Sequence, residues 1–197
     1  LAATGVCLRL GVEIDDIIER IRGLEPQRGR MSVLAGIDDT ILIDDSYNSN
    51  PPSVLAALEV LAKYNSRKIA VLGKMNELGE YEKEAHQIVA EQAAKSANIL
   101  YLVGDRAIIS KMAEIAKKEN KTIEIETFIN PYKAGERLRK VLKKQDVVLF
   151  KGSQNGVFLE EAIKYVLKNR EDTELMVRKT NFWLRKKELE FKNKGNR

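Results

Sequence analysis

The stretch KIAVLGKMNELGEYEKEAHQIVAEQAAKSANILYLVG, residues 68–104, decides the fold class. Two short and almost entirely apolar runs, 68–72 and 99–103, are each followed by a glycine, and the segment between them has helical spacing over 80–95. Apolar runs of this length are typical of strands that are covered on both faces, as in parallel sheets. A strand, a helix and a second strand in succession therefore predict one βαβ unit.

The same alternation continues in both directions along the chain. Further strands are predicted at 31–35, 40–44, 122–128, 146–150 and 174–177, and further helices at 53–64, 105–119, 131–143 and 157–167. The four residues 36–39 join the first two strands as a β-hairpin. We therefore predict an α/β fold: a Rossmann-like, mostly parallel sheet with helices on both faces, preceded by a hairpin strand. Right-handed crossovers gather the strand-to-helix loops at one edge of such a sheet, where ligands bind.

The N-terminal residues predict a separate unit. Helical spacing at 1–10 and 13–24 is followed by Pro26 and Gly29, which mark a linker. Because the chain starts at Leu1 within a helical pattern, we expect a piece of a longer protein. The predicted parts are a short helical remnant of an upstream domain with its hinge (1–29), the sheet domain (30–177) and a basic tail (178–197).

The composition is that of an ordinary globular domain. Of the 197 residues, 44% are hydrophobic and 32% are charged, which excludes a disordered or collagen-like chain. One cysteine and one histidine exclude a disulfide framework and a Cys/His zinc cage. No apolar run approaches the roughly 20 residues that span a bilayer, so we expect no membrane span. A lone free cysteine favours a reducing compartment, and we expect a cytoplasmic location.

The net charge of +5 comes from the C-terminus. Residues 178–197 hold eight basic and two acidic side chains, a net charge of +6, which leaves −1 for residues 1–177. A nucleic-acid binder usually spreads its basic residues over one face of the folded domain, so we expect no nucleic-acid partner. We interpret the segment as a solvated, partly helical tail. Five of its apolar side chains could instead dock part of it on the domain or on a partner: Phe182, Trp183, Leu184, Leu189 and Phe191.

The richest polar segment is DDSYNSN, residues 44–50, which follows a predicted strand and precedes a predicted helix. It holds two carboxylates, two carboxamides and two serine hydroxyls within seven positions, an unusual density of hydrogen-bonding groups. Such residues also form ordinary turns, but a turn needs only one or two of them. The segment is therefore predicted to be a binding loop.

Two further loops belong to the same predicted edge. In KGS, residues 151–153, the glycine lets the backbone approach a ligand, and the start of the next helix attracts anions. The same three residues also fit a common strand-to-helix junction. The loop 73–80 lacks the spacing of a phosphate-binding P-loop, as does the rest of the chain. His86, on the following helix, is interpreted as structural or exposed.

Taken together, these motifs resemble the Mur ligase family over residues 1 to about 170. The segments that carry the resemblance are LAA (1–3), EPQRGR (25–30), IDDSYNSNP (43–51), VLGKMNELGE (71–80) followed by His86, and KGS (151–153). The Tyr-Asn-x-Asn-Pro form of the central motif resembles the branch of the family that adds a dipeptide. Lys74 departs from the family pattern, where an aspartate is usual, and Gln154 and Asn155 stand where an arginine often follows KGS.

The resemblance implies a three-domain, ATP-dependent ligase of peptidoglycan synthesis. In that family, ATP phosphorylates the terminal carboxylate of a UDP-linked muramoyl peptide, here a tripeptide, and the amine of D-alanyl-D-alanine attacks the acyl phosphate. ATP and Mg²⁺ are bound mainly by a central domain, of which this chain holds only the end. The resemblance therefore implies that the chain is inactive without its upstream domains.

The resemblance also implies roles for individual residues, none of them catalytic or metal-binding. The predicted ATP contacts are Arg30, Asp44 and Asp45. The predicted substrate contacts are Tyr47, Asn48, Asn50, Lys151 and Ser153. One alternative from a different class stays open, a stand-alone Rossmann-like module that binds a nucleotide or another small ligand.

Overall fold

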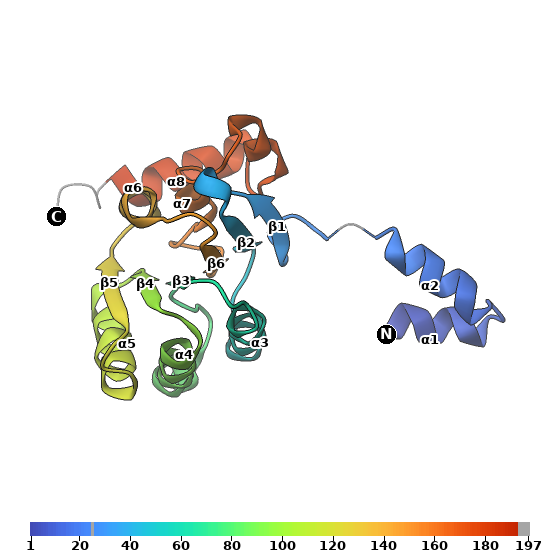
Figure 1. The fold of residues 1–197 in the computed structure, drawn as a ribbon, viewed down its shortest axis with the longest axis horizontal. Coiled ribbons are helices and arrows are strands. Elements are labelled where there is room, and N and C mark those ends of the chain that lie inside the picture. The colour runs from blue at the N-terminus through green and yellow to red at the C-terminus, as the bar shows by residue number, and fades with distance from the viewer. Residues whose placement is uncertain (25, 193–197) are drawn as a thin grey trace.

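The structure is a computed structural model that describes residues 1–24 and 26–192 (Figure 1). Residue 25 of the predicted linker and residues 193–197 of the predicted tail lie outside the described part. Six strands form one sheet in the order β1-β2-β6-β3-β4-β5, and only β1 is antiparallel to its neighbour. The strands are β1 (Ser32–Ala35), β2 (Ile41–Asp45), β3 (Lys68–Gly73), β4 (Ile99–Val103), β5 (Glu124–Phe128) and β6 (Val147–Lys151). The predicted hairpin and mostly parallel α/β sheet are thereby confirmed.

Helices cover both faces of this sheet. In Figure 1, α3, α4 and α5 lie on one face, and α6, α7 and α8 lie on the other. Because side chains alternate along a strand, each inner strand contributes to two cores. In β3, Ala70 and Leu72 pack in the first core, while Ile69 and Val71 pack in the second. The helices are α1 (Ala2–Arg9), α2 (Ile14–Arg22), α3 (Pro51–Ala62), α4 (Glu82–Ser96), α5 (Arg106–Glu119), α6 (Pro131–Val141), α7 (Glu160–Ile163) and α8 (Asn181–Lys192).

The strand order creates a crevice at the carboxyl edge. The chain runs from β2 to β3 past the position of β6, which is inserted between them last. The helix after β3 covers one face of the sheet and the helix after β6 covers the other (Figure 1). Loops that leave neighbouring strands toward opposite faces open a crevice between them, the usual ligand site of such sheets.

Local sequence signals fix where the helices begin. Asn50 caps α3, because its side chain accepts a hydrogen bond from the backbone N–H of Ser53 at 3.0 Å, and Pro51 occupies the first helical position. Asp105 and Asn130 cap α5 and α6 in the same way. The cap at Asn50 ends the loop after β2 abruptly and holds it close to the sheet.

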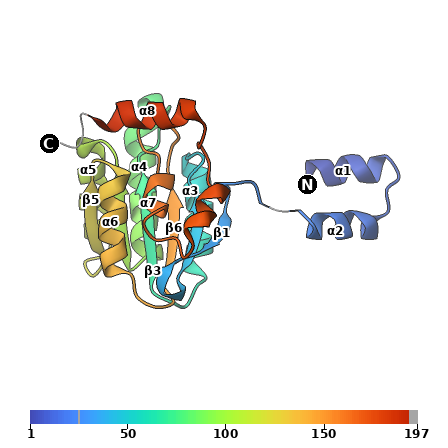
Figure 2. The same ribbon diagram turned by 90° about the horizontal axis from the view of Figure 1, so that it is seen from above.

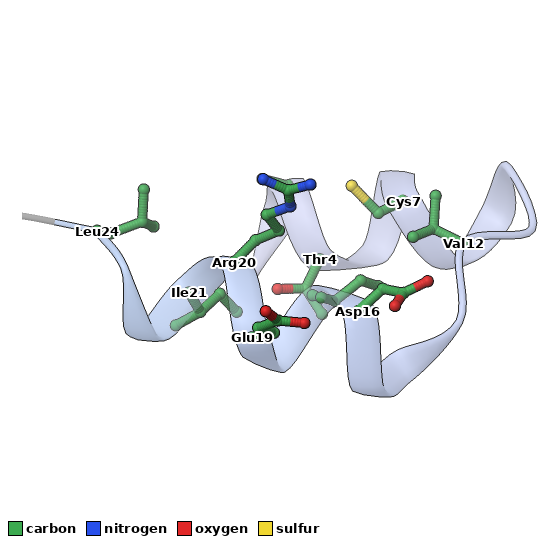
Figure 3. A pocket seen from close by; sticks show the side chains of 10 residues that line it. Thr4, Cys7, Val12, Asp16, Glu19, Arg20, Ile21 and Leu24 are labelled. Atoms are coloured by element: carbon green, nitrogen blue, oxygen red, sulfur yellow. The ribbon is translucent and has the colours of Figure 1, made fainter.

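The N-terminal hairpin of α1 and α2 stands apart from the sheet (Figures 1 and 2). A groove of about 500 Å³ runs between the two helices, and Figure 3 shows side chains such as Cys7 and Arg20 along it. Ile17 is the one buried residue of these two helices. Within the described residues, no helix is long and apolar enough to cross a membrane.

Three expectations for the C-terminal third differ from the structure. The predicted helix at 157–167 contains only one turn of α-helix, α7, because Phe158 takes a left-handed backbone conformation (φ 47°) ahead of it. The predicted strand at 174–177 is wrong, since a 3₁₀ segment, Arg170–Leu175, enters this region. The tail is also less solvated than expected: the structure buries Lys187 and Phe191 of α8 against the domain.

Candidate functional site

The loop between β2 and α3, residues 46–50, is divided between buried and exposed side chains. Ser46 and Ser49 are buried, whereas Tyr47, Asn48 and Asn50 are exposed at the carboxyl edge. The division follows from the short path between the end of β2 and the cap of α3. The loop therefore presents one phenol ring and two carboxamides to solvent.

Beneath the loop lies a buried ion pair. The ammonium group of Lys151, at the end of β6, lies 2.5 Å from Asp45 Oδ2 at the end of β2 and donates a second hydrogen bond to the carbonyl of Asn48 at 3.1 Å. The side chain of Lys151 is only 1% exposed, and this burial lowers its pKa, which the neighbouring Asp45 partly restores. The other oxygen of Asp45 accepts a hydrogen bond from the backbone N–H of Met31 at 3.3 Å. The pair therefore ties the loop to β6 and to the start of β1.

Asp44 is completely buried next to this pair. Its Oδ1 accepts a hydrogen bond from the backbone N–H of Ser46 at 3.0 Å, while Oδ2 has no hydrogen-bond partner within residues 1–24 and 26–192. Burial raises the pKa of the Asp44 carboxyl, because the charged form loses its hydration. Asp44 thus shapes the backbone turn at Ser46 from inside the protein.

A polar cavity of about 190 Å³ opens in the crevice between these loops. It is lined by residues from the loops after β2, β3 and β6: Asn48, Ser49, Asn50, Asn76, Glu77, Leu78, Ser153 and Gln154. Four of these side chains are carboxamides, two are hydroxyls and one is a carboxylate. Ser49 is buried, and its hydroxyl has no hydrogen-bond partner among the described residues.

The walls of the cavity are tied together by hydrogen bonds. Ser153 Oγ accepts from the backbone N–H of Asn76 at 3.0 Å, and the Asn76 carboxamide donates to the carbonyl of Asn155 at 2.8 Å. Glu77 follows with a positive φ of 62°, an uncommon conformation for this residue type that is typical of constrained, functional loops. The loops after β3 and β6 therefore form one rigid wall.

His86 supports this wall from below, as the sequence predicted for a structural histidine. Its Nε2 accepts a hydrogen bond from the backbone N–H of Met75 at 3.0 Å, and its Nδ1 lies 2.8 Å from the carbonyl of Glu82. Nδ1 must carry the proton, because a carbonyl can only accept. Because Nε2 accepts and Nδ1 donates, the ring is neutral. Burial lowers the pKa of His86 below its ordinary value.

The hinge residues reach the binding loop from the other direction. The backbone N–H of Tyr47 donates to the carbonyl of Gly29 at 3.0 Å, and the guanidinium carbon of Arg30 lies 4.4 Å from the centre of the Tyr47 ring. Gly29 has a φ of 67°, and a Cβ there would lie 3.0 Å from a methyl group of Val177. Only glycine fits this junction comfortably. Arg30 itself is exposed beside the loop.

The predicted site residues fall into three groups. Asn48, Asn50 and Ser153 meet in the cavity, while Arg30 and Tyr47 stack together outside its lining. The other three are buried beneath the loop: Asp44, Asp45 and Lys151. A ligand reaches those three only if the loop moves, so their predicted role as direct contacts stays a prediction.

The cavity also holds residues that received no predicted role. The sequence places the loop 73–80 at the edge of the sheet and in the family pattern, but nothing in it singles out Asn76 or Glu77. Ser49 lay inside the predicted binding loop without an assigned contact. Gln154 stands out in the sequence only as a departure from the family pattern. These residues enter the site through the sheet register, which joins segments about 80 residues or more apart in sequence.

The comparisons with known proteins agree with this geometry. The sequence profile described as "Mur ligase, glutamate ligase domain" matches residues 29–154, a range that contains every residue lining the cavity. The chain belongs to the Mur ligase family. Within the described residues, no group of three or more His, Cys, Asp or Glu side chains is placed to hold a metal ion.

Two curated relatives share one enzyme name. UDP-N-acetylmuramoyl-tripeptide–D-alanyl-D-alanine ligase of Buchnera aphidicola is 37% identical over 131 residues, 65% of this chain and 27% of that protein. The Escherichia coli K12 ligase of the same name is 30% identical over 176 residues, 86% of this chain and 36% of that protein. The crystal structure of MurF ligase from Thermotoga maritima in complex with ADP matches with a TM-score of 0.69 and 28% identity, over 87% of this chain and 36% of that one. The chain therefore spans about a third of the length of these relatives.

Proposed function

We propose that this chain is the C-terminal part of an ATP-dependent ligase that joins D-alanyl-D-alanine to a UDP-N-acetylmuramoyl tripeptide during peptidoglycan synthesis. The observation that carries the proposal is the polar cavity at the carboxyl edge, built by the same three loops that the family profile matches. The relatives named for this reaction support it. The reaction belongs in the cytoplasm, where ATP and nucleotide-linked precursors are made.

The proposed reaction has two steps. The terminal carboxylate of the tripeptide attacks the γ-phosphorus of ATP, which forms an acyl phosphate and releases ADP. The free amine of D-alanyl-D-alanine then attacks the acyl carbon, so that a peptide bond forms and inorganic phosphate leaves. Both steps need the partners held in line and shielded from water, which is positioning rather than covalent catalysis by the protein. The upstream domains, with ATP and Mg²⁺, supply the phosphoryl-transfer chemistry.

The cavity suits a small zwitterion with an amide. Its volume of about 190 Å³ lies below the roughly 300–1,000 Å³ of sites for drug-sized ligands, which favours a dipeptide over a nucleotide. Carboxamides and hydroxyls can both donate to the carboxylate and accept from the amide of such a molecule. Glu77 is the one carboxylate of the lining and provides an acceptor for the ammonium group. Leu78 offers an apolar contact for a methyl group.

ATP contacts are assigned to the hinge side of the loop. Arg30 is exposed and always charged, and a planar guanidinium suits the oxygens of a transferring phosphoryl group. Asp44 and Asp45 stay proposed as acceptors for the ribose hydroxyls, reached after a movement of the loop. Tyr47 stays proposed as a substrate contact. Lys151 stays proposed as one as well, on the same condition that the loop moves. The Thermotoga maritima relative was solved with ADP, which supports nucleotide use at this family's sites.

The test uses the full-length enzyme that contains this chain. We expect synthesis of the pentapeptide precursor with D-alanyl-D-alanine, and little product with single amino acids. Asn48→Ala should raise the KM for the dipeptide roughly tenfold, more than the KM for ATP, because it removes a carboxamide from the cavity. Asn65→Ala, at an exposed position after α3, is the matched control. A larger effect on the KM for ATP would reassign the loop, and absence of ligation with any amine would refute the function.

A further inference from the structure

The C-terminal segment returns to the binding loop through one buried arginine. The side chain of Arg178 is only 2% exposed, and its residue has a positive φ of 56°. Its guanidinium donates to the carbonyl of Ser46 at 3.2 and 3.3 Å and to the carbonyl of Tyr47. The same group donates to Glu160 Oε2 at 2.7 Å. Arg178 therefore links α7 to the backbone of the loop.

A lysine of α8 completes this buried cluster. The ammonium of Lys187 lies 2.9 Å from Glu160 Oε1 and 2.6 Å from Glu161 Oε1, and it donates to the carbonyl of Arg178 at 3.1 Å. The carboxylates of Glu160 and Glu161 are buried as well. Arg178 and Lys187 thus neutralise these two carboxylates inside the protein, and the partly exposed Lys164 also binds Glu161 at 2.8 Å. We call Arg178, Lys187, Glu160 and Glu161 the tail clamp.

The cost of such a cluster calls for a reason beyond stability. Removing four charges from water is expensive, and well-packed apolar residues often stabilise a site as well or better. What apolar residues cannot do is bind backbone carbonyls in a fixed direction, as a planar guanidinium does. The carbonyls that Arg178 binds belong to Ser46 and Tyr47, immediately before Asn48 of the cavity.

The loop is therefore held from two sides. Lys151 binds the carbonyl of Asn48 from beneath, and Arg178 binds the two preceding carbonyls from the tail. The Arg178 guanidinium carbon also lies 5.5 Å from the centre of the Tyr47 ring. The family profile ends at residue 154, so all four residues of the tail clamp lie outside the matched region.

We propose that Arg178, fixed by Glu160 and Lys187, is a positioning residue that sets the backbone of the binding loop and thereby the affinity for the amino substrate. This inference rests on the proposed ligase function. In the proposed reaction Arg178 touches no reacting atom, and it acts through Tyr47 and Asn48. The tail is in this sense a part of the substrate site.

The test compares Arg178→Met and Arg178→Lys with Arg185→Met, an exposed arginine of α8. In the full-length enzyme, Arg178→Met should raise the KM for D-alanyl-D-alanine roughly tenfold, since small misplacements of binding groups cost one to two powers of ten. The KM for the UDP-linked tripeptide should not change. A purely structural role would lower the amount of active enzyme, and hence kcat, and would leave both KM values alone.

Hydrogen exchange gives a second readout that needs no activity. In the chain of 197 residues, Arg178→Met should speed exchange of the backbone amides at 46–49 about tenfold or more, with strands β3 and β4 unchanged. Arg178→Lys keeps the charge beside Glu160 but cannot form all the bonds of the planar fork, so it should fold and still show the raised KM and faster exchange. The Arg178→Lys variant therefore still tests the proposal if Arg178→Met fails to fold.

The outcomes separate the two proposals. Unchanged loop exchange and unchanged KM in Arg178→Lys would overturn the positioning role, as would an equal effect of Arg185→Met. If the wild-type enzyme ligates some other amine, the proposed function fails, while the exchange experiment still decides whether the tail clamp holds the loop.

Discussion

Strand β6 has an ion pair at each end, and the two pairs hold different parts of the structure. At the amino end, Arg67 forms a two-pronged contact with Asp146, at 2.9 and 2.5 Å, and Arg67 also donates to the carbonyl of Val141 at 2.8 Å. At the carboxyl end, Lys151 binds Asp45 and the carbonyl of Asn48. The first pair closes the turn that leads into β6, and the second underlies the candidate site.

The two pairs differ in burial and in the cation that they use. The amino-end pair uses the rigid fork of an arginine and leaves that side chain 26% exposed to water. The carboxyl-end pair is almost fully buried and uses a lysine, whose single ammonium reaches the loop as well as its partner. We therefore expect damage to the first pair to affect folding alone, and damage to the second to affect both folding and substrate binding.

The largest effect is expected for Lys151→Met. It leaves the Asp45 carboxylate buried without its cation, which should cost about 3–5 kcal/mol of unfolding free energy, measured by urea denaturation. In the full-length enzyme the KM for D-alanyl-D-alanine should also rise, because the carbonyl of Asn48 loses its donor. The double variant Asp45→Asn/Lys151→Met should recover part of the stability and none of the affinity. A wild-type KM for the dipeptide in either variant would show that the carboxyl-end pair has no role in substrate binding.

A smaller effect is expected for Arg67→Met. It breaks the amino-end pair, but the amide of Lys143 still donates to Asp146 at 2.8 Å and water can reach the site. We expect a loss of about 2 kcal/mol by urea denaturation, less than for a fully buried pair. The KM for the dipeptide should stay within twofold of wild type. If it rises as in Lys151→Met, the two ends of β6 are not separate.

The smallest effect concerns His86, whose neutral ring supports the cavity wall without any charge. Its pKa is lowered in the folded state, so below pH 6.5 the unfolded chain takes up a proton that the folded chain refuses. Stability should therefore fall as the pH drops, by at most about 1 kcal/mol between pH 6.5 and 5.5. His86→Gln should lose this component, as measured by the difference in urea midpoints. Identical pH slopes in both proteins would contradict it.

The regular part of the fold was predictable because its signals are local. Apolar runs such as 99–103 and caps such as Asp105 and Asn130 mark their elements without help from distant residues. The helix predicted at 157–167 is mostly absent because distant residues decide the structure there. Its helical spacing is real, but distant cations draw Glu160 and Glu161 into the interior, and the left-handed turn at Phe158 shortens the helix.

The sequence predicts where the candidate site lies better than it predicts the contacts within it. The density of polar residues at 44–50 marked the binding loop, and three of the predicted residues line the cavity: Asn48, Asn50 and Ser153. The sequence did not indicate that Lys151 and Asp45 neutralise each other, because 106 residues separate them. The pairing follows from β2 lying beside β6, a strand order that no local pattern encodes.

The tail clamp has a built-in optical reporter. Trp183 is the single tryptophan of the chain, and its ring packs edge-on against Phe158, 6.1 Å away between centres, at the start of α8. Indole fluorescence shifts to longer wavelengths when the ring becomes hydrated. Release of α8 would therefore change the emission colour of this chain while the sheet is still folded, so undocking can be followed in real time without a label.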